Sequence, residues 1–388
     1  MPPQAAQRVR TLPPYLFHEI DRLKRAARAA GKDVIDFGVG DPDLPTPGFI
    51  IERMQQAVAD PANHRYPFNE GSAKYREAMA VFCQRRYGVT LDPATQIVAL
   101  IGSKEGIAHL PLAVVDPGRV VLVPEPGYPV YRASAILAGA TPYTLPLTEA
   151  RGWLPDLTSI PSDVAKQAAL LFINYPNNPT GAVATAGFFR DTVAFARQYD
   201  LIVAQDAAYN ELFFDAPPLS ILQTPGAMDV AIELHSASKT FNMTGWRLGF
   251  AAGNAEVVGA LTKTKSVIDS GVFTAVQEAG MTGYAGLERP ELKELQQTYR
   301  ERAQTLVAGL RTVGFRVAEP KATFYVWAAI PAGLDSMTVA RRLLEELAVV
   351  CIPGAGFGPA GEGYVRFALT VPTERIRVAI SRLATLKW

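Results

Sequence analysis

Residues 230–253 read VAIELHSASKTFNMTGWRLGFAAG. Two apolar runs in this stretch, VAIEL at 230–234 and RLGFAAG at 247–253, predict two buried strands. Between them Lys239 lies among serines, just after the first run, and Arg247 follows eight residues later. Lysine side chains normally remain in water, so a lysine at the end of a buried strand indicates a chemical role.

Five further apolar runs precede this pair, and stretches of helical character separate them. These runs are QIVALI (96–101), RVVLV (119–123), TPYTLPL (141–147), ALLFIN (169–174) and LIVAQ (201–205). Short apolar runs that alternate with helices are typical of a parallel sheet with helices on both faces. The sequence therefore predicts an α/β fold in which seven buried strands form a mainly parallel sheet.

The overall composition indicates small-molecule chemistry. The chain has 388 residues, 48% of them hydrophobic, and its 38 basic and 37 acidic residues give a net charge of +1. This balance provides no broad attraction to nucleic acid or to an anionic membrane. Cys83 and Cys351 lack metal-ligand spacing, and no apolar stretch is long enough to span a bilayer. We expect a cytoplasmic protein with reduced thiols and with no nucleic-acid or membrane partner.

The residues directly after the predicted strands carry most of the polar chemistry. GSKEG follows QIVALI, YPNNPTG follows ALLFIN, DAAYNE follows LIVAQ, and HSASK follows VAIEL. In open α/β sheets, ligands bind at the carboxyl ends of the strands. We therefore expect these side chains to face one cavity.

Four of these side chains are candidates for binding a phosphate group. Ser103 opens a predicted helix, whose first N–H groups and dipole favour an anion. Ser236, Ser238 and Arg247 would add further donors. Taken alone, Ser103 also fits a simple helix N-cap.

Four other residues are candidates for binding an aromatic cofactor and a carboxylate. Asp206 follows a buried strand, where a carboxylate needs a cation, and a protonated ring nitrogen would satisfy it. Tyr209 and Asn178 fit a phenolate oxygen, and the planar guanidinium of Arg366 suits a carboxylate. Each residue also has a simpler explanation: a helix-capping aspartate, a packing aromatic, a turn-forming asparagine and a strand arginine that faces solvent or forms an ion pair.

Two other patterns do not support a site. GFGPAG (356–361) matches the dinucleotide-binding pattern GxGxxG, but it contains Pro359 and an extended segment follows it where a helix is needed. The histidines, which are His18, His64, His109 and His235, show no metal-ligand spacing. We expect neither a dinucleotide nor a metal ion.

A buried lysine that can form a Schiff base, a carboxylate for a pyridinium nitrogen, donors for a phenolate oxygen and a phosphate site together indicate pyridoxal phosphate. The sequence resembles the class I and II aminotransferases of fold type I over essentially its whole length. SASKTFNMTGWRLG (236–249), NNPTG (177–181), DAAY (206–209) and a late arginine occur in family order. The resemblance implies ping-pong transfer of an amino group between an amino acid and a 2-keto acid, with 2-oxoglutarate as the expected acceptor.

The resemblance also implies roles for individual residues. Lys239 is the catalytic lysine, and the substrate-binding residues are Gly40, Asn178 and Arg366, of which Arg366 binds the α-carboxylate. The cofactor-binding residues are Tyr66, Ser103, Lys104, Tyr128, Asn178, Asp206, Tyr209, Ser236, Ser238, Lys239 and Arg247. Tyr128 matches the aromatic position that stacks on the cofactor ring. Tyr66 matches a tyrosine that reaches the phosphate from the partner subunit, which implies a homodimer with shared active sites.

We expect three segments along the chain. Residues 1–43 form an N-terminal arm of the small domain, and the apolar residues at helical spacing in it are Leu16, Ile20, Leu23 and Ala27. Residues 44–286 form the large cofactor-binding domain. Residues 287–388 contain a polar bridging helix, within 288–314, and the remainder of a smaller α+β domain.

Three stretches are similar to LL-diaminopimelate aminotransferases and their close relatives: IGSKEGIAHL (101–110), LHSASKTFNMTGWRLGF (234–250) and IDSGVFTAVQEAG (268–280). Residues 266–287 contain no lysine or arginine, so the partner-subunit arginine of aspartate-specific members is missing and aspartate should be a poor donor. Asn69, where some diaminopimelate enzymes carry a glutamate, and residues 269–271 are candidate contacts for the distal end of a longer donor.

Other functions fit the same cofactor residues. An aspartate/alanine-type or broad-specificity aminotransferase and a carbon–sulfur lyase would both use them. A regulator that merely binds pyridoxal phosphate fits less well, because such proteins carry an additional DNA-binding domain, whereas about forty residues with one predicted helix and no basic patch precede the Gly/Pro-rich connector here.

Overall fold

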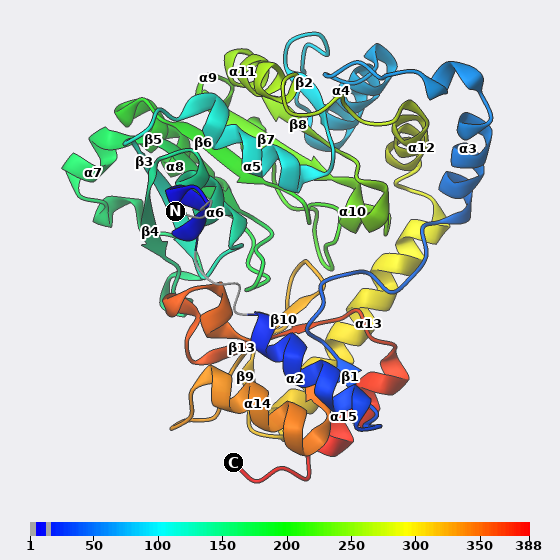
Figure 1. The fold of residues 1–388 in the computed structure, drawn as a ribbon, viewed down its shortest axis with the longest axis vertical. Coiled ribbons are helices and arrows are strands. Elements are labelled where there is room, and N and C mark those ends of the chain that lie inside the picture. Colours follow the sequence, from blue (N-terminus) through cyan, green and yellow to red (C-terminus); the bar gives the residue numbers. More distant parts are fainter. Residues whose placement is uncertain (1–4, 13–16) are drawn as a thin grey trace.

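The computed structural model of the chain describes residues 5–12 and 17–388, so Leu16 lies outside the described residues. The larger part of the molecule is built on a seven-stranded sheet with the strand order β2-β8-β7-β6-β5-β3-β4 (Figure 1). The strands are β2 Ile97–Leu100, β3 Val120–Glu125, β4 Thr141–Pro146, β5 Ala168–Asn174, β6 Ile202–Asp206, β7 Ala231–Ser236 and β8 Gly249–Gly253. Each strand coincides with one of the predicted apolar runs, which confirms the α/β fold.

The sheet is mainly parallel, as predicted. β8 is antiparallel to both of its neighbours, β2 and β7, and the other pairs of strands are parallel. The expectation of seven buried strands was wrong for β4, in which Leu145 is buried while most other side chains are partly or fully exposed. β4 is the last strand of the sheet and has a neighbour on one side only.

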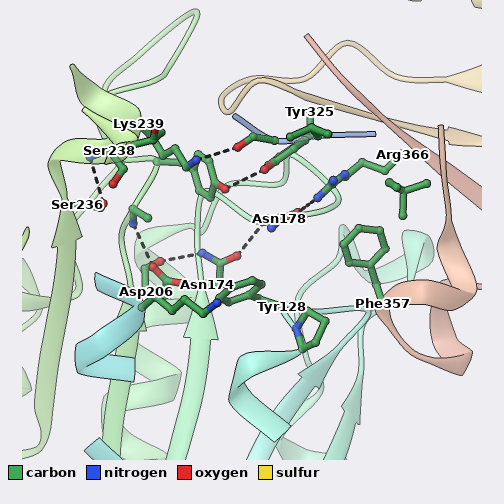
Figure 2. A pocket seen from close by; sticks show the side chains of 18 of the residues that line it. Tyr128, Asn174, Asn178, Asp206, Ser236, Ser238, Lys239, Tyr325, Phe357 and Arg366 are labelled. Atoms are coloured by element: carbon green, nitrogen blue, oxygen red, sulfur yellow. Dashed lines mark hydrogen bonds between the residues drawn. The ribbon is translucent and has the colours of Figure 1, made fainter. Parts of the chain in front are cut away.

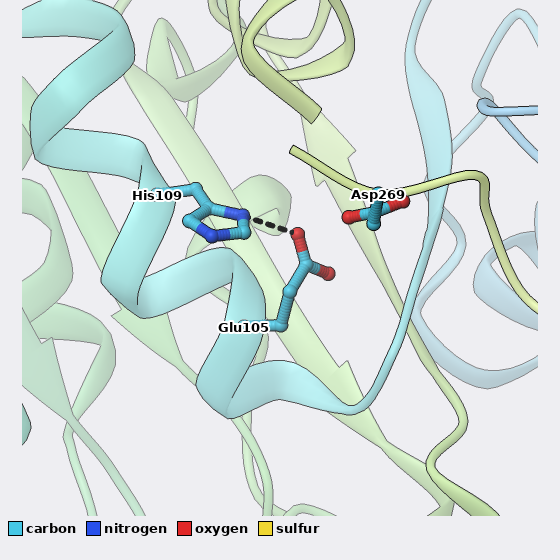
Figure 3. A group of neighbouring side chains, drawn as sticks. All are labelled: Glu105, His109 and Asp269. Atoms are coloured by element: carbon cyan, nitrogen blue, oxygen red, sulfur yellow. Dashed lines mark hydrogen bonds and ion pairs between the residues drawn. The ribbon is translucent and has the colours of Figure 1, made fainter. Parts of the chain in front are cut away.

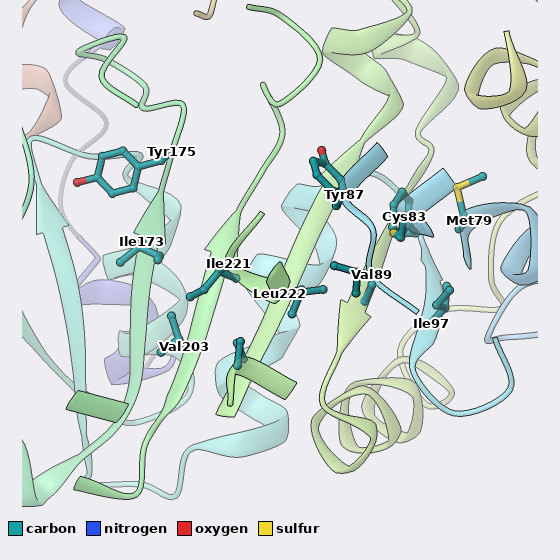
Figure 4. Packing of buried hydrophobic residues seen from close by; sticks show 14 of the residues in the cluster. Met79, Cys83, Tyr87, Val89, Ile97, Ile173, Tyr175, Val203, Ile221 and Leu222 are labelled. Carbon is teal, nitrogen blue, oxygen red and sulfur yellow. The ribbon is translucent and has the colours of Figure 1, made fainter. Parts of the chain in front are cut away.

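Helices cover both faces of this sheet, which explains why its strands are apolar on both sides. Leu170 and Phe172 of β5 pack in the core beneath α5, α6 and α11, whereas Leu171 and Ile173 pack in the core beneath α3, α4, α8 and α12. Figure 4 shows part of the second core. The helices are α3 Gly48–Val58, α4 Ala73–Tyr87, α5 Ser103–Val114, α6 Val130–Leu137, α7 Ser162–Gln167, α8 Ala186–Tyr199, α9 Ala227–Val230, α10 Ala237–Thr240, α11 Ala255–Lys265 and α12 Thr274–Ala285.

The smaller part of the molecule surrounds a four-stranded antiparallel sheet with the order β12-β13-β10-β9. Its strands are β9 Arg316–Val317, β10 Tyr325–Ala329, β12 Ile352–Pro353 and β13 Tyr364–Ala368. β1 (Ile35–Asp36) pairs in parallel with β11 (Val349–Val350), so the N-terminal segment joins this unit. The helices here are α2 Phe17–Ala29, α14 Ser336–Leu347 and α15 Thr373–Leu383.

Helix α13 (Pro290–Thr312) bridges the two units, as the sequence predicts (Figure 1). Leu292 packs in the core of the large sheet, while Leu295 and Leu306 pack in the core of the small one. The short helix α1 (Gln7–Arg10) lies against α6. The N-terminal arm therefore contacts both units, and the division of the chain at residues 43 and 286 stays a prediction.

Two further observations concern the predicted environment. Cys83 and Cys351 are buried in different hydrophobic cores, and both are free thiols. Within residues 5–12 and 17–388, no helix has the length and apolar character needed to cross a bilayer.

Candidate active site

A cavity of about 450 Å³ lies between the carboxyl edge of the large sheet and the small unit (Figure 2). Apart from Tyr66, every residue predicted for the site lines it. These residues are Gly40, Ser103, Lys104, Tyr128, Asn178, Asp206, Tyr209, Ser236, Ser238, Lys239, Arg247 and Arg366. Strands β5, β6 and β7 end at this cavity, so residues that are distant in sequence meet at the sheet edge.

Lys239 lies in the single-turn helix α10, directly after β7. Its Nζ donates a hydrogen bond to the carbonyl of Gly40 at 2.8 Å and lies 5.4 Å from the centre of the Phe324 ring. Burial lowers the pKa of Lys239 from 10.5 to about 8, although the nearby Asp41 carboxylate acts in the opposite direction. A larger fraction of this amine is therefore unprotonated, and nucleophilic, than for a lysine in water.

Asp206 is the last residue of β6 and is buried. Its Oδ2 accepts the hydroxyl hydrogen of Tyr131 at 2.7 Å, and its Oδ1 accepts the N–H of Ala208 at 3.2 Å. Burial raises the pKa of Asp206 to about 6, and these two hydrogen bonds offset only part of that effect. A turn, not a helix, follows at 208–211, so the helix-capping explanation was wrong. No lysine or arginine among the described residues forms an ion pair with this carboxylate, so a cationic ligand would be favoured beside it.

An anion site lies where α5 begins. The N-cap of α5 is Gly102, with φ of 74° and no side-chain cap, so the explanation of Ser103 as an N-cap was wrong. A Cβ at Gly102 would lie 2.3 Å from Nη2 of Arg247, so glycine is needed both for its backbone conformation and for the approach of this guanidinium. Arg247 Nη1 lies 3.4 Å from Oγ of Ser238. Helix N–H groups, a serine and a guanidinium thus meet at one point, which suits a phosphate.

Arg366 on β13 is buried, so the solvent-facing explanation for this arginine was wrong. Nη1 donates to Oδ1 of Asn178 and Nη2 donates to the carbonyl of Gly38, both at 2.9 Å. The guanidinium carbon lies 4.2 Å from the centre of the Tyr325 ring and 4.8 Å from that of Phe357. Nε has no partner, and no carboxylate in the described part of the chain pairs with this cation. The arrangement therefore favours an anionic ligand.

The sequence did not identify several residues that line the cavity: Asp21, Lys24, Tyr131, Asn174, Tyr325 and Phe357. Asn174 ends β5, so the strand-end rule would have found it, and its Nδ2 donates to the carbonyl of Asp206 at 2.9 Å. Phe357 belongs to the rejected GFGPAG stretch, which forms two short 3₁₀ turns. Nothing in the local sequence marks Tyr131 or Tyr325 as a site residue.

Tyr66 does not line the cavity of its own chain. Its side chain is 90% exposed, and its function in a partner subunit stays a prediction. Asn69 also lies outside this cavity, beside Gly271, where a Cβ would lie 3.3 Å from the Asn69 Cα. The candidate contacts at 69 and 269–271 are therefore adjacent to each other, and they are separate from the cavity within one chain.

Cations reach the cavity from outside residues 266–287. Lys104, in the first turn of α5, lines the cavity and makes no ion pair or hydrogen bond with the described residues. Lys24 of α2 also lines it and pairs with Asp21 at 2.8 Å and with Asp36 at 3.1 Å. Because Lys24 is already paired with two carboxylates, a second carboxylate on a ligand would find an unpaired positive charge on α5, at Lys104.

One cluster near the cavity has the composition of a metal site. Glu105, His109 and Asp269 bring their ligand atoms within 4.8 Å of one another (Figure 3). Nζ of the buried Lys265 lies 2.9 Å from Oε1 of Glu105 and 3.0 Å from Oδ2 of Asp269. This ammonium is already paired with both carboxylates, so the cluster is better described as an ion-pair network that joins the 269–271 loop to α5.

Comparisons with known proteins place this geometry in a family. Residues 32–383 match the family model "Aminotransferase class I and II". The LL-diaminopimelate aminotransferase of Syntrophobacter fumaroxidans is 52% identical over 384 residues, which cover 99% of each chain. The LL-diaminopimelate aminotransferase of Aquifex aeolicus is 51% identical over 98% of this chain and 99% of its own.

The chain is also similar to solved structures over nearly its whole length. Apo-BacF from Bacillus subtilis superposes with a TM-score of 0.94 at 37% identity, over 100% of this chain and 99% of its own. A probable N-succinyldiaminopimelate aminotransferase from Thermus thermophilus gives a TM-score of 0.89 at 37% identity, over 95% of this chain and 99% of its own.

Proposed function

The chain belongs to the class I and II aminotransferase family, and we propose that its amino donor is LL-diaminopimelate, with 2-oxoglutarate as the acceptor. It is an enzyme that depends on pyridoxal phosphate and transfers an amino group between an amino acid and a 2-keto acid. The observation that carries the choice of donor is the similarity, at about 50% identity over the full chain, to enzymes named LL-diaminopimelate aminotransferase.

The cavity fits pyridoxal phosphate in three respects. Asp206 is a buried carboxylate without a cationic partner among the described residues, which suits a protonated pyridine nitrogen. The start of α5, with Ser238 and Arg247, would hold the phosphate, and the amine of Lys239 would bind the aldehyde. When bound, the cofactor supplies a conjugated ring that stabilises negative charge at the donor's Cα.

We propose the following contributions from the protein side chains. Arg366 binds the α-carboxylate of the donor, because it is buried, planar and unpaired with any carboxylate of the described residues. Asn178 holds this guanidinium through its Oδ1. Lys239 takes the proton from the donor's Cα and returns it to the cofactor, a role that suits an amine whose pKa is lowered to about 8.

A donor with charges at both ends fits the remaining surface of the cavity. The distal end of LL-diaminopimelate carries one ammonium and one carboxylate. Lys104, which has no ion-pair partner among the described residues, would attract the carboxylate, and the half-exposed Asp21 would attract the ammonium. These charges support the proposal independently of the relatives' names.

The donor is tested by comparing kcat/KM for LL-diaminopimelate, L-2-aminopimelate, aspartate, alanine and phenylalanine, each with 2-oxoglutarate. L-2-aminopimelate is the matched control, because it lacks only the distal amino group. We expect LL-diaminopimelate to lead the series and aspartate to be poor. Aspartate in the lead would contradict the donor, and release of ammonia and pyruvate from a cysteine-type substrate would indicate a lyase.

We also propose that the enzyme is a homodimer with shared active sites. Tyr66 and Phe68, two residues apart, are 90% and 69% exposed in the single chain, and neighbouring exposed aromatic side chains are typical of subunit interfaces. Mixing the Tyr66→Ala and Lys239→Ala variants should restore activity, because one site in each heterodimer would then contain both residues. Verified subunit exchange without recovery would place Tyr66 outside the partner's site.

A further inference from the structure

Tyr325, the first residue of β10, contacts both sides of the cavity. Its side chain is buried, with 3% exposure. Its hydroxyl oxygen lies 3.1 Å from that of Tyr209, and its ring lies 4.2 Å from the guanidinium carbon of Arg366. One side chain therefore links a tyrosine on the sheet side to the arginine on the opposite side, as Figure 2 shows for Tyr325 and Arg366.

The surrounding backbone leaves Tyr325 little freedom. A Cβ at Gly40 would lie 2.1 Å from the Tyr325 hydroxyl oxygen, so this close approach needs glycine. The carbonyl of the same Gly40 accepts the hydrogen bond from Lys239. The hydroxyl of Tyr325 thus lies beside the residue that orients the lysine.

A strained turn directly precedes Tyr325 and fixes its position. Thr323 is buried and has φ of 70°, which is a strained conformation for a β-branched residue. Its N–H donates to the carbonyl of Leu212 at 2.7 Å, and its Oγ1 accepts the N–H of Tyr325 at 3.1 Å. Such strain persists where the surrounding structure imposes it, and it is commonly found at functional sites. The next residue, Phe324, places its ring beside Lys239.

The two phenols share a single hydrogen bond, so the direction of donation matters. Burial, and next the neighbouring Tyr325, raise the pKa of Tyr209 well above its ordinary value, so Tyr209 keeps its proton. If Tyr325 donates, the hydrogen of Tyr209 is free to point into the cavity. If Tyr209 donates, its hydrogen is bound by the Tyr325 oxygen and cannot point into the cavity.

We infer that Tyr325 is a positioning residue for amino-group transfer: its hydroxyl donates to Tyr209, so that Tyr209 presents its own hydrogen to the cofactor's phenolic oxygen, while its ring supports Arg366. This inference rests on the proposed function of the site. The hydroxyl and the ring can be tested separately, because phenylalanine retains the ring and leucine does not.

The first experiment needs no amino donor. In Tyr325→Phe, the dissociation constant for pyridoxal phosphate should rise by up to about tenfold, the effect of one neutral hydrogen bond, because Tyr209 would be less well held to donate to the cofactor. The pH midpoint of the absorbance change of the lysine-bound cofactor should shift upward, because Tyr209 would be less well oriented to donate to the phenolic oxygen, and that hydrogen bond favours the ionised form of the oxygen. An unchanged dissociation constant together with an unchanged midpoint would overturn the inference.

A double-substitution series distinguishes positioning from general damage. Tyr209→Phe alone and Tyr209→Phe combined with Tyr325→Phe should give the same midpoint, because Tyr325 acts through Tyr209. Fully additive shifts would overturn the inference. Tyr364→Phe is the control. Tyr364 lies on the neighbouring strand β13, does not line the cavity, and donates its hydroxyl hydrogen to Glu149 at 2.8 Å. This substitution should leave both measurements unchanged.

The role of the Tyr325 ring is tested by measuring KM with the donor that has the highest kcat/KM in the donor comparison. Tyr325→Phe should keep KM within about twofold of the wild-type value, whereas Tyr325→Leu should raise it about threefold to tenfold through loss of the cation–π contact. Equal KM values for the two variants would overturn the support of Arg366. A different leading donor would correct the proposed function and leave the cofactor measurements valid.

Discussion

The two sides of the cavity are built in different ways. On the sheet side, Ser103, Asp206, Ser236 and Lys239 lie at strand ends or at the start of a helix, and backbone and hydroxyl groups hydrogen-bond several of them. On the opposite side, Arg366 comes from within a strand and lies between aromatic rings. We propose that the first side holds the cofactor and the second recognises the donor.

This difference shows how each side is held in place. The sheet side depends on strands that pair directly with one another, so its geometry follows from one sheet. The opposite side depends on the packing of the small unit against the large one, through α13 and through the contacts of residues 321–323 with residues 212–214. Changes on the sheet side should therefore affect every donor alike, whereas changes on the other side should depend on the donor.

The largest expected effect is on the sheet side. Lys239→Ala should lower kcat about 10²- to 10⁴-fold with every donor, because the group that moves the Cα proton is lost. The cofactor should still bind through the phosphate site. Single-turnover kinetics check this, and borohydride reduction of the wild-type enzyme should fix the cofactor on the peptide that contains Lys239. Label on another lysine, or unchanged turnover, would contradict the assignment.

Asp206→Ala should raise the dissociation constant for pyridoxal phosphate about 30-fold or more, because removing one partner of a buried charge pair leaves the other unpaired. Deprotonation at Cα should also slow, since the ring nitrogen would no longer be held protonated. Cofactor titration of the apoenzyme measures the first effect. Asp191→Ala, on the exposed face of α8, is the control and should behave like the wild type.

Arg366→Lys tests the donor side. KM should rise about tenfold or more while kcat changes less, because an ammonium cannot replace two parallel hydrogen bonds to a carboxylate. Steady-state kinetics with two different donors measure the effect. Arg382→Lys is the matched control, because it alters a partly exposed arginine of α15 that pairs with Asp33 and does not line the cavity. A KM equal to that of the wild type would show that Arg366 does not bind the donor's α-carboxylate.

The pKa of Lys239 predicts a pH dependence for the apoenzyme. The unprotonated amine reacts with the cofactor aldehyde, so the rate of cofactor incorporation should fall about tenfold per pH unit below about pH 8 and level off above it. A lysine at its ordinary pKa of 10.5 would give a rate that continues to rise to that pH. Stopped-flow absorbance between pH 6 and 10 would distinguish the two profiles.

The smallest expected effect is at Asp21 on the donor side. Asp21→Asn should lower the preference for LL-diaminopimelate over L-2-aminopimelate about fivefold or less, because Asp21 is 48% exposed and exposed ion pairs are weak. The ratio of kcat/KM for the two donors is the measurement. An unchanged ratio would exclude Asp21 from binding the distal ammonium. The group that binds this ammonium would then have to come from the partner subunit.

The sequence by itself determined the fold and most of the sheet side. Apolar runs predict strands because two covered faces require apolar residues at every position, and ligands bind where parallel strands end. Ser103, Asp206 and Lys239 could therefore be found from their places relative to those runs. Gly40 and Tyr128 were found only through a family resemblance, because their neighbours in the sequence show no such pattern.

The tertiary structure alone decided which other residues reach the cavity. Tyr131 contacts Asp206 from another element, Tyr325 arrives through a strained turn, and Phe357 comes from a stretch with a misleading glycine pattern. The contact of Tyr131 with Asp206 joins residues 75 positions apart, and that of Tyr325 with Tyr209 joins residues 116 positions apart. Local periodicity reports which face of an element is buried, but the packing of the two units against each other decides which buried side chains meet.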